Sequence, residues 1–255
     1  KDRTVIEIDD RDVRFITSAL PVEAPLSSIF ESYRFFKGSL AAVGEAAFLG
    51  CLYAAIMVDG SFASGRGGLG RVMASKNLQA VAIRGSGKPQ VYDHDQEERA
   101  RKDIIRLFDA SPAIMGRSGI SRYGTAALVD LMASRRMMPT ANFRKTFFEG
   151  YREFSATRIK ARENPQNHAC YGCPIACKKK AASAVPEFET LSHFGALNEN
   201  ADLSSIIEAN TICNEIGVDT ITAASTIACL AEIRQQQYTG RALTDKVREI
   251  CSSQG

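Results

Sequence analysis

The chain has 255 residues, of which 45% are hydrophobic, and a formal net charge of +3 at pH 7. That length suits one large domain or two of moderate size, and the near-balanced charge argues against bulk binding of nucleic acid. The longest apolar stretch, residues 46–58, is too short to span a bilayer. Seven cysteines, an odd number, favour a reducing cytoplasm over a secreted disulfide scaffold.

The front of the chain mixes strand and helix patterns. Residues 4–9 alternate like a strand, and residues 25–36 have the apolar spacing of a helix. The apolar segment 48–60 predicts one or two buried strands, and the β-rich run 78–85 predicts another. We therefore expect a mixed α and β region here.

Helical patterns dominate after a boundary near residue 92. They cover residues 94–110, 124–138, 204–217, 219–237 and 244–253. The sequence thus predicts an α+β fold, divided into residues 1–92 and 93–255. Because the chain begins in a strand pattern without an initiator methionine and ends just past a helical pattern, we expect a piece of a longer protein.

Three cysteines are concentrated in the segment HACYGCPIACKKK, residues 168–180. Cys170, Cys173 and Cys177 have the spacing C-x2-C-x3-C, which is too tight for internal disulfides and leaves a third thiol over. Cubane iron–sulfur clusters bind three close cysteines and one remote cysteine, whereas zinc sites usually combine one C-x2-C with a second distant pair. We interpret the segment as a [4Fe–4S] site, with zinc and a structural or redox role as alternatives.

A cubane needs a fourth ligand, and Cys213, Cys229 and Cys251 are the candidates within the chain. Cys213 and Cys229 lie on apolar helical faces, so we expect them to be buried core thiols, as free cysteines often are. Cys51 is expected to be buried for the same reason. His168 is interpreted as a loop histidine near the site.

Three lysines, Lys178 to Lys180, follow the cysteines directly. Runs of this kind are most often a solvated surface. The sharper hypothesis is a docking surface for an acidic electron carrier, through complementary charge.

A glycine-rich stretch occupies residues 64–85. Its G-x-G-x-x-G spacing is formed by Gly65, Gly67 and Gly70. A dinucleotide-binding loop would need a full crossover helix before the next strand, and too few residues are available for one. Backbone N–H groups of such a turn can instead bind an anion, with Arg66, Arg71 and Lys76 gripping phosphate. A plain turn with surface basic residues is the alternative.

Together these stretches resemble the aldehyde ferredoxin oxidoreductase family of tungsten or molybdenum bis-pterin enzymes. The similar segments keep the family's order and spacing over nearly the whole chain. They are VGEAA (43–47), SGRGGLGRVMASKNLQAVAIRG (64–85), MPTANFRKTFFEG (138–150), CYGCPIAC (170–177), PEFETL (186–191) and ICNEIGVDTIT (212–222).

The resemblance implies that residues 1–92 are the C-terminal part of a β-rich domain that forms a base for the pterin. Residues 93–255 would be the first of two helical domains and would carry the iron–sulfur loop. The family's first strands and last helical domain would be missing, and with them the fourth cluster cysteine and a second pterin-binding loop.

The resemblance also implies roles for individual residues. Cys170, Cys173 and Cys177 match three ligands of the [4Fe–4S] cluster. NEIGVD, residues 214–219, matches the family's pterin-binding D-x-x-G-L-D pattern, although Asn and Val replace the first Asp and the Leu. The implied cofactor-binding positions are Ser64, Gly65, Arg66, Gly67, Gly68, Lys76, Asn214, Gly217 and Asp219. The simpler hypothesis for Asp219 is an N-cap of the following helix.

Within that set, Arg66 and Lys76 would contact the pterin phosphates. The Ser64 carbonyl would face a Mg²⁺ ion that bridges the two phosphates. Glu187 and Glu189 match an acidic pair that places a carboxylate near the metal, where it could move protons. The alternative is a pair of exposed strand carboxylates, and His193 is expected to be structural.

The chemistry implied by the resemblance is oxidation of a small aldehyde to a carboxylic acid. Electrons would leave through the cluster to ferredoxin or an iron–sulfur electron-transfer subunit, in a homo- or hetero-oligomer. A second hypothesis within the family is reduction of an aromatic acyl-CoA thioester. A third, from another class, is a non-catalytic iron–sulfur electron-transfer or scaffold subunit.

Overall fold

The computed structural model describes residues 2–182 and 184–252, which form two compact units. Unit 1 contains Lys1–Gly87, Glu208–Leu230 and Arg241–Gly255. Unit 2 contains Lys88–Ile207 and Ala231–Gly240. Each unit therefore contains segments that are distant in the sequence. The predicted division into family domains at residues 92 and 93 stays a prediction.

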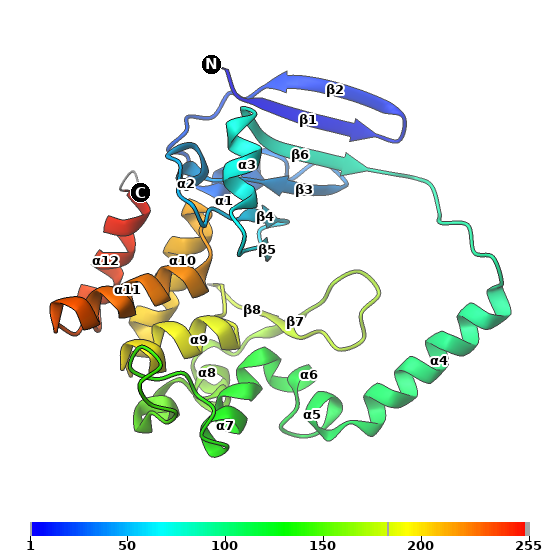
Figure 1. The fold of residues 1–255 in the computed structure, drawn as a ribbon. Helices are drawn as coiled ribbons and strands as arrows, with labels where there is room; N and C mark the ends of the chain where they lie inside the picture. The colour runs from blue at the N-terminus through cyan, green and yellow to red at the C-terminus, as the bar shows by residue number, and fades with distance from the viewer. Residues whose placement is uncertain (1, 183, 253–255) are drawn as a thin grey trace. The chain divides into compact units, whose positions relative to one another are not determined.

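Unit 1 is built on a six-stranded mixed sheet in the order β2-β1-β6-β3-β4-β5 (Figure 1). The strands are β1 (Thr4–Asp9), β2 (Asp12–Thr17), β3 (Ser39–Ala42), β4 (Ile56–Val58), β5 (Phe62–Ser64) and β6 (Leu78–Arg84). Strands β1 and β6 are parallel, and the other neighbouring pairs are antiparallel. Because β5 and β6 are not neighbours, the glycine stretch between them is not part of a dinucleotide-binding crossover.

One face of this sheet forms the core of unit 1. Alternate residues of the strands point to that face, as the period of two along a strand requires. They meet α1 (Leu26–Ser32), whose Leu26 and Ile29 are almost fully buried. The strand residues of this core are Val5, Leu40, Ala42, Met57, Ala80 and Ala82.

Unit 1 also contains α2 (Glu45–Phe48), α3 (Leu69–Ser75) and α12 (Arg241–Ser252). It includes the C-terminal part of α10 (Leu203–Ile216) and most of α11 (Thr220–Arg234).

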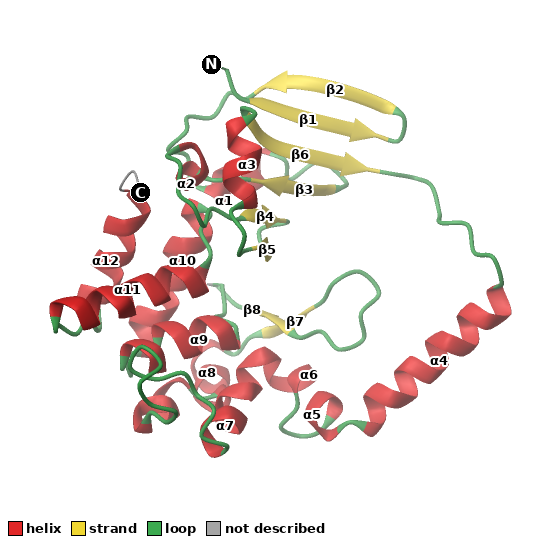
Figure 2. Ribbon diagram, in the orientation of Figure 1, coloured by secondary structure: helices red, strands yellow, loops and turns green. Residues whose placement is uncertain are grey.

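Unit 2 is mainly helical and holds one short hairpin (Figure 2). Its helices are α4 (His94–Ala110), α5 (Pro112–Met115), α6 (Ile120–Tyr123), η1 (Gly124–Ala126), α7 (Ala127–Ser134), η2 (Glu149–Phe154), α8 (Ala156–Glu163), α9 (Phe188–Phe194) and η3 (Ala196–Asn198). The hairpin pairs β7 (Gln166–His168) with β8 (Lys178–Lys180). Phe154, Leu191 and Phe194 are fully buried in this unit.

The predicted α+β class is confirmed, and the helix predicted over residues 94–110 has those bounds. Most of segment 48–60 is not strand, since β4 covers only Ile56–Val58. The residues before β4 form turns, and their N–H groups donate to backbone carbonyls outside the sheet. The expected end of the last helix at Ser253 lies outside the described residues. In the part of the chain that the structure describes, no helix is long and apolar enough to cross a membrane.

Candidate functional sites

The glycine turn, residues 65–68, connects β5 to α3. Gly67 and Gly68 have φ angles of 104° and 67°, in the left-handed region that favours glycine. A Cβ atom at Gly68 would lie 2.4 Å from the carbonyl oxygen of Leu52. The turn therefore needs glycine both for its backbone conformation and for its close approach to other backbone.

In unit 1, segment 212–222 lies between the glycine turn and segment 43–47 and approaches both closely. A Cβ at Gly65 would lie 2.6 Å from Oδ1 of Asp219, and a Cβ at Gly44 would lie 2.2 Å from the carbonyl oxygen of Ile216. The Ala55 N–H donates to the Gly217 carbonyl over 2.8 Å. We call this arrangement the glycine cradle: the turn itself, Gly44 and residues 216–219. It is lined largely by backbone because side chains do not fit between its parts.

Asp219 is buried and uses its two carboxylate oxygens differently. Oδ2 accepts from the backbone N–H and the hydroxyl of Thr222 over 2.8 and 2.6 Å, which caps the start of α11. Oδ1 is the oxygen next to Gly65. The capping hypothesis is therefore correct, and one oxygen still faces the glycine turn.

The end of α10 places Gly217 in the cradle. The N–H groups of Gly217 and Val218 both donate to the carbonyl of Cys213 over 2.9 Å. Gly217 has a φ of 82°, as a helix C-terminus closed in this way commonly requires. Helix termination and cradle geometry thus depend on the same glycine.

Most of the other predicted cofactor positions lie at or near this cradle. Ser64 is exposed at the end of β5, Arg66 is exposed on the turn, and Asn214 is half-buried in the last turn of α10. Lys76 is at the opposite end of α3, and seven helical residues span about 10 Å. The structure therefore separates Lys76 from the turn that holds Arg66.

The cysteine hairpin, residues 166–180, has β7 and β8 as its arms and the three predicted cysteines on its loop (Figure 1). Its register pairs His168 with Lys178. Cys170 is exposed, and Cys173 and Cys177 are partly exposed. The Cys173 N–H donates to the Cys170 carbonyl over 3.0 Å. Three thiols thus lie on one ordered, accessible loop.

No three Cys, His, Asp or Glu side chains among the described residues are grouped for a single metal ion. A cubane binds each thiolate to a different iron, so it accepts thiols that are farther apart than a mononuclear site would.

Glu187 and Glu189 lie at the start of α9, so the alternative of two exposed strand carboxylates is wrong, while their predicted place near a metal stays a prediction. A carboxylate is favoured at a helix N-terminus, and this preference outweighs the short alternating pattern around Phe188. Glu187 forms an ion pair with Lys178 over 2.9 Å, whereas Glu189 is exposed in the first helical turn. The His193 ring lies 2.8 Å from the Glu189 carbonyl oxygen.

Three other cysteines, Cys51, Cys213 and Cys251, are buried in unit 1, as expected for the first two. Burial raises the pKa of Cys51. A hydrogen bond with Cys251, and then burial, raise the pKa of Cys213 well above its usual range. Cys229 is exposed, contrary to expectation, because polar and apolar residues are spread almost evenly around α11 and its pattern does not show which side faces inward.

Sequence reasoning missed several residues that shape these sites. Gly44 was part of a recognised segment, and its role would have required knowing that Ile216 lies beside it. Lys179 is partly buried: its Nζ donates to the carbonyls of Ser121 and Ala176 over 2.9 and 2.7 Å. Burial lowers the pKa of Lys179. The run of three lysines gave no signal that one of them points inward.

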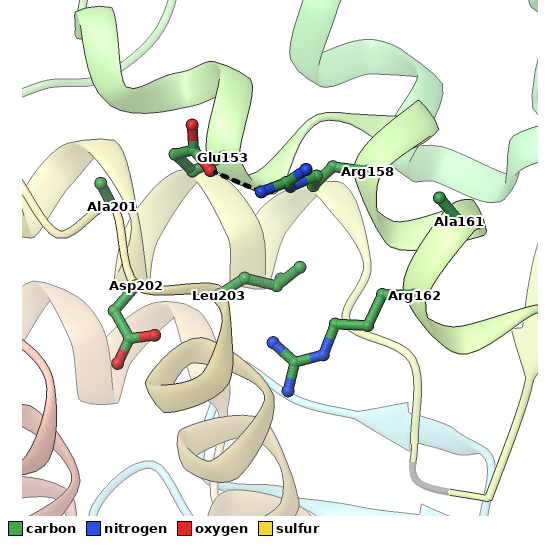
Figure 3. A pocket seen from close by; sticks show the side chains of 7 residues that line it. All are labelled: Glu153, Arg158, Ala161, Arg162, Ala201, Asp202 and Leu203. Carbon is green, nitrogen blue, oxygen red and sulfur yellow. Dashed lines mark hydrogen bonds and ion pairs between the residues drawn. The ribbon is translucent and has the colours of Figure 1, made fainter.

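A hollow of about 460 Å³ in unit 2 is lined by none of the predicted residues (Figure 3). Its lining residues are Glu153, Arg158, Ala161, Arg162, Ala201, Asp202 and Leu203. Arg158 is paired with Glu153, and Arg162 contacts Glu163 and Ser204. Since both arginines already have partners, we assign the hollow no ligand.

Comparison with known proteins defines the class to which this fold and these motifs belong. Residues 1–85 match the family model "Aldehyde ferredoxin oxidoreductase, N-terminal domain", and residues 99–249 match "Aldehyde ferredoxin oxidoreductase, domains 2 & 3". The class is therefore a family of oxidoreductases. In particular, the chain belongs to the aldehyde ferredoxin oxidoreductase family.

Curated relatives include the tungsten-containing aldehyde ferredoxin oxidoreductases of Thermococcus kodakarensis and Pyrococcus furiosus. They are 36% and 34% identical to the chain, over 78% and 79% of it. The match covers 34% of each relative, so the chain spans about a third of their length.

Another relative is the WOR-like subunit of the aliphatic sulfonate oxidoreductase of Pyrococcus furiosus, which is 28% identical over 72% of the chain. A solved structure, the active site complex BamBC of benzoyl coenzyme A reductase with 1,5 dienoyl-CoA, shares the fold. Its TM-score is 0.72 at 18% identity, over 92% of this chain and 38% of that one.

Proposed function

We propose that this chain is part of an oxidoreductase that oxidises aldehydes to carboxylic acids at a tungsten or molybdenum bis-pterin centre. Electrons would leave through a [4Fe–4S] cluster to ferredoxin or an iron–sulfur subunit. The tungsten-containing aldehyde ferredoxin oxidoreductases among its relatives support the choice of metal and substrate. The observation that carries the proposal is the close approach of the glycine turn to Asp219.

The glycine cradle fits the phosphate end of a pterin. Its turn presents backbone where a Cβ would collide with Leu52 or Asp219, and the exposed Arg66 guanidinium can grip phosphate through two parallel hydrogen bonds. The Ser64 carbonyl at the end of β5 would help to hold a Mg²⁺ ion that accompanies the pterin. When bound, the pterin-held metal would supply the two-electron chemistry.

The cysteine hairpin fits three corners of a cubane cluster. Its thiols are accessible, and they lie on one loop at a spacing typical of such clusters. The positive φ of Gly172, 70°, lets the loop turn between the first two ligands. Cys170, Cys173 and Cys177 would hold the cluster together with a fourth ligand.

Of the two carboxylates, we propose Glu187 as the group that moves protons. Lys178 holds its side chain in one place, and preorganised groups are the more effective catalysts. Glu189 is exposed, so its carboxylate would have to be ordered again in each catalytic cycle. Comparing turnover of Glu187→Gln and Glu189→Gln at equal metal content separates the two roles.

The central test is the cofactor content of the full chain purified without oxygen. Tungsten or molybdenum together with pterin and iron supports the enzyme. Iron alone would support the non-catalytic electron carrier, and zinc alone would contradict both. Cys173→Ser should abolish the brown chromophore and the EPR signal of the reduced cluster, and an unchanged spectrum would remove the cluster assignment. Location in the cytoplasm and the nature of the oligomer stay predictions.

A further inference from the structure

The three lysines of β8 have three different environments. Lys178 forms an ion pair with Glu187, and Lys180 is exposed. Lys179 is partly buried, and its ammonium donates to two backbone carbonyls on different segments. A docking surface for an acidic partner would need lysines that point to solvent, so Lys179 has another role.

The two acceptors place Lys179 across the base of the cysteine hairpin. The Ala176 carbonyl, 2.7 Å away, belongs to the residue immediately before Cys177. The Ser121 carbonyl, 2.9 Å away, belongs to α6. One side chain therefore connects the end of the ligand loop to the helical body of unit 2.

The backbone around this connection is strained and closely packed. Ala176 has a φ of 49°, which is unusual for a residue with a side chain. Gly124 has a φ of 69°, and a Cβ there would lie 2.8 Å from the Cys177 carbonyl oxygen and 2.9 Å from Cγ of Lys179. A conformation of this kind persists only when its surroundings hold it in place. The Lys179 hydrogen bond to Ala176 is one such constraint.

We propose that Lys179 is a positioning residue for the cysteine hairpin: its ammonium fixes the Ala176 carbonyl, and with it the direction of Cys177, and adds one positive charge beside that ligand. The inference rests on the proposed function, because the charge matters only if the hairpin holds a cluster. A nearby positive charge stabilises the reduced, more negative cluster. Its removal is expected to lower the reduction potential.

The test compares three variants of the full chain. Lys179→Gln removes the charge and shortens the side chain, Lys179→Arg keeps the charge, and Lys180→Gln removes an exposed lysine of the same strand as a matched control. Two measurements are made on each: hydrogen exchange of residues 170–177 before iron is added, and the midpoint potential after reconstitution of the cluster with iron and sulfide.

Lys179→Gln should speed exchange in the loop severalfold and lower the midpoint potential. A tenfold change in the redox equilibrium would correspond to about 59 mV for one electron. Lys179→Arg should restore most of the potential, and Lys180→Gln should match the wild type in both measurements. Equal exchange and equal potential in Lys179→Gln and the wild type would overturn the inference, as would equal effects of the two Gln variants. If the wild type forms no cluster, the proposed function fails, while hydrogen exchange still tests the positioning role.

Discussion

The glycine cradle and the cysteine hairpin are held in place by different kinds of contact. The cradle joins three segments that are distant in the sequence, and its contacts are mainly between backbone atoms that glycine allows to approach. The hairpin is one continuous stretch whose functional groups are side chains, and a few hydrogen bonds hold it in place. Substitutions that add one methyl group should therefore damage the cradle severely, whereas loss of a thiol in the hairpin should change chemistry and leave the fold intact.

The largest effect is expected from Gly44→Ala, which would break the cradle. The new Cβ would lie 2.2 Å from the Ile216 carbonyl oxygen, and backbone cannot rotate away as a side chain can. We expect a loss of about 3 kcal/mol in the free energy of unfolding. Gly85→Ala is the matched control, since a Cβ there meets nothing within 4 Å. Equal urea midpoints for the two variants would contradict the close approach of Gly44 to the Ile216 carbonyl.

A smaller loss is expected from Gly65→Ala, because its neighbour is the end of a side chain. The Cβ would lie 2.6 Å from Oδ1 of Asp219, which can move at the cost of its hydrogen bonds to Thr222. We expect about 1–2 kcal/mol. If the clash is the cause, combining Gly65→Ala with Asp219→Ala should cost less than the sum of the two single changes. Additive losses in thermal unfolding would contradict the contact.

The same difference between local and distant contacts explains how much the sequence could predict. The cysteine loop could be recognised in the sequence because its three thiols lie within eight adjacent positions, whereas the two short strands beside it, β7 and β8, were not predicted. The glycine turn was predictable as a turn, but the contact of Gly44 with Ile216 depends on how α10 ends against another segment. The alternative of strand carboxylates at Glu187 and Glu189 failed because four residues with alternating character fit a strand and a helix start equally well. The exposure of Cys229 was unpredictable because polar and apolar residues are distributed almost evenly around α11.

Asp219 allows the structural and cofactor roles of the cradle to be separated. Asp219→Ala removes the cap of α11 and should cost about 1 kcal/mol of stability, whereas Asn caps nearly as well as Asp. Asp219→Asn should therefore keep the melting temperature within a degree or two of the wild type. If the carboxylate also contacts the cofactor, pterin content should fall in both variants. Full pterin occupancy in Asp219→Asn would restrict this residue to capping.

The smallest effect concerns the buried thiols of unit 1, which have no counterpart in the exposed hairpin. Cys51 and Cys213 have pKa values raised above the usual 9.0, so in the folded state they keep their protons where the unfolded chain begins to lose them. Stability should thus be constant below about pH 8 and fall as the pH rises through 9, by less than about 1 kcal/mol per thiol at pH 9.5. Tyrosines interfere little in this window, since they titrate near 10.0 when unfolded and burial raises the pKa of Tyr33 to about 12.

Urea midpoints between pH 8 and 9.5, measured in reductant, test this expectation through their slope. Cys213→Ala should flatten the slope, because the variant has no thiol to deprotonate in either state at that position. Cys229→Ala changes an exposed thiol and should leave the slope as it is. If Cys213→Ala and the wild type lose stability equally with pH, then the Cys213 thiol is not shielded as the contact with Cys251 requires. The tight packing that is found in unit 1, and that the cysteine hairpin lacks, would then not extend to α10.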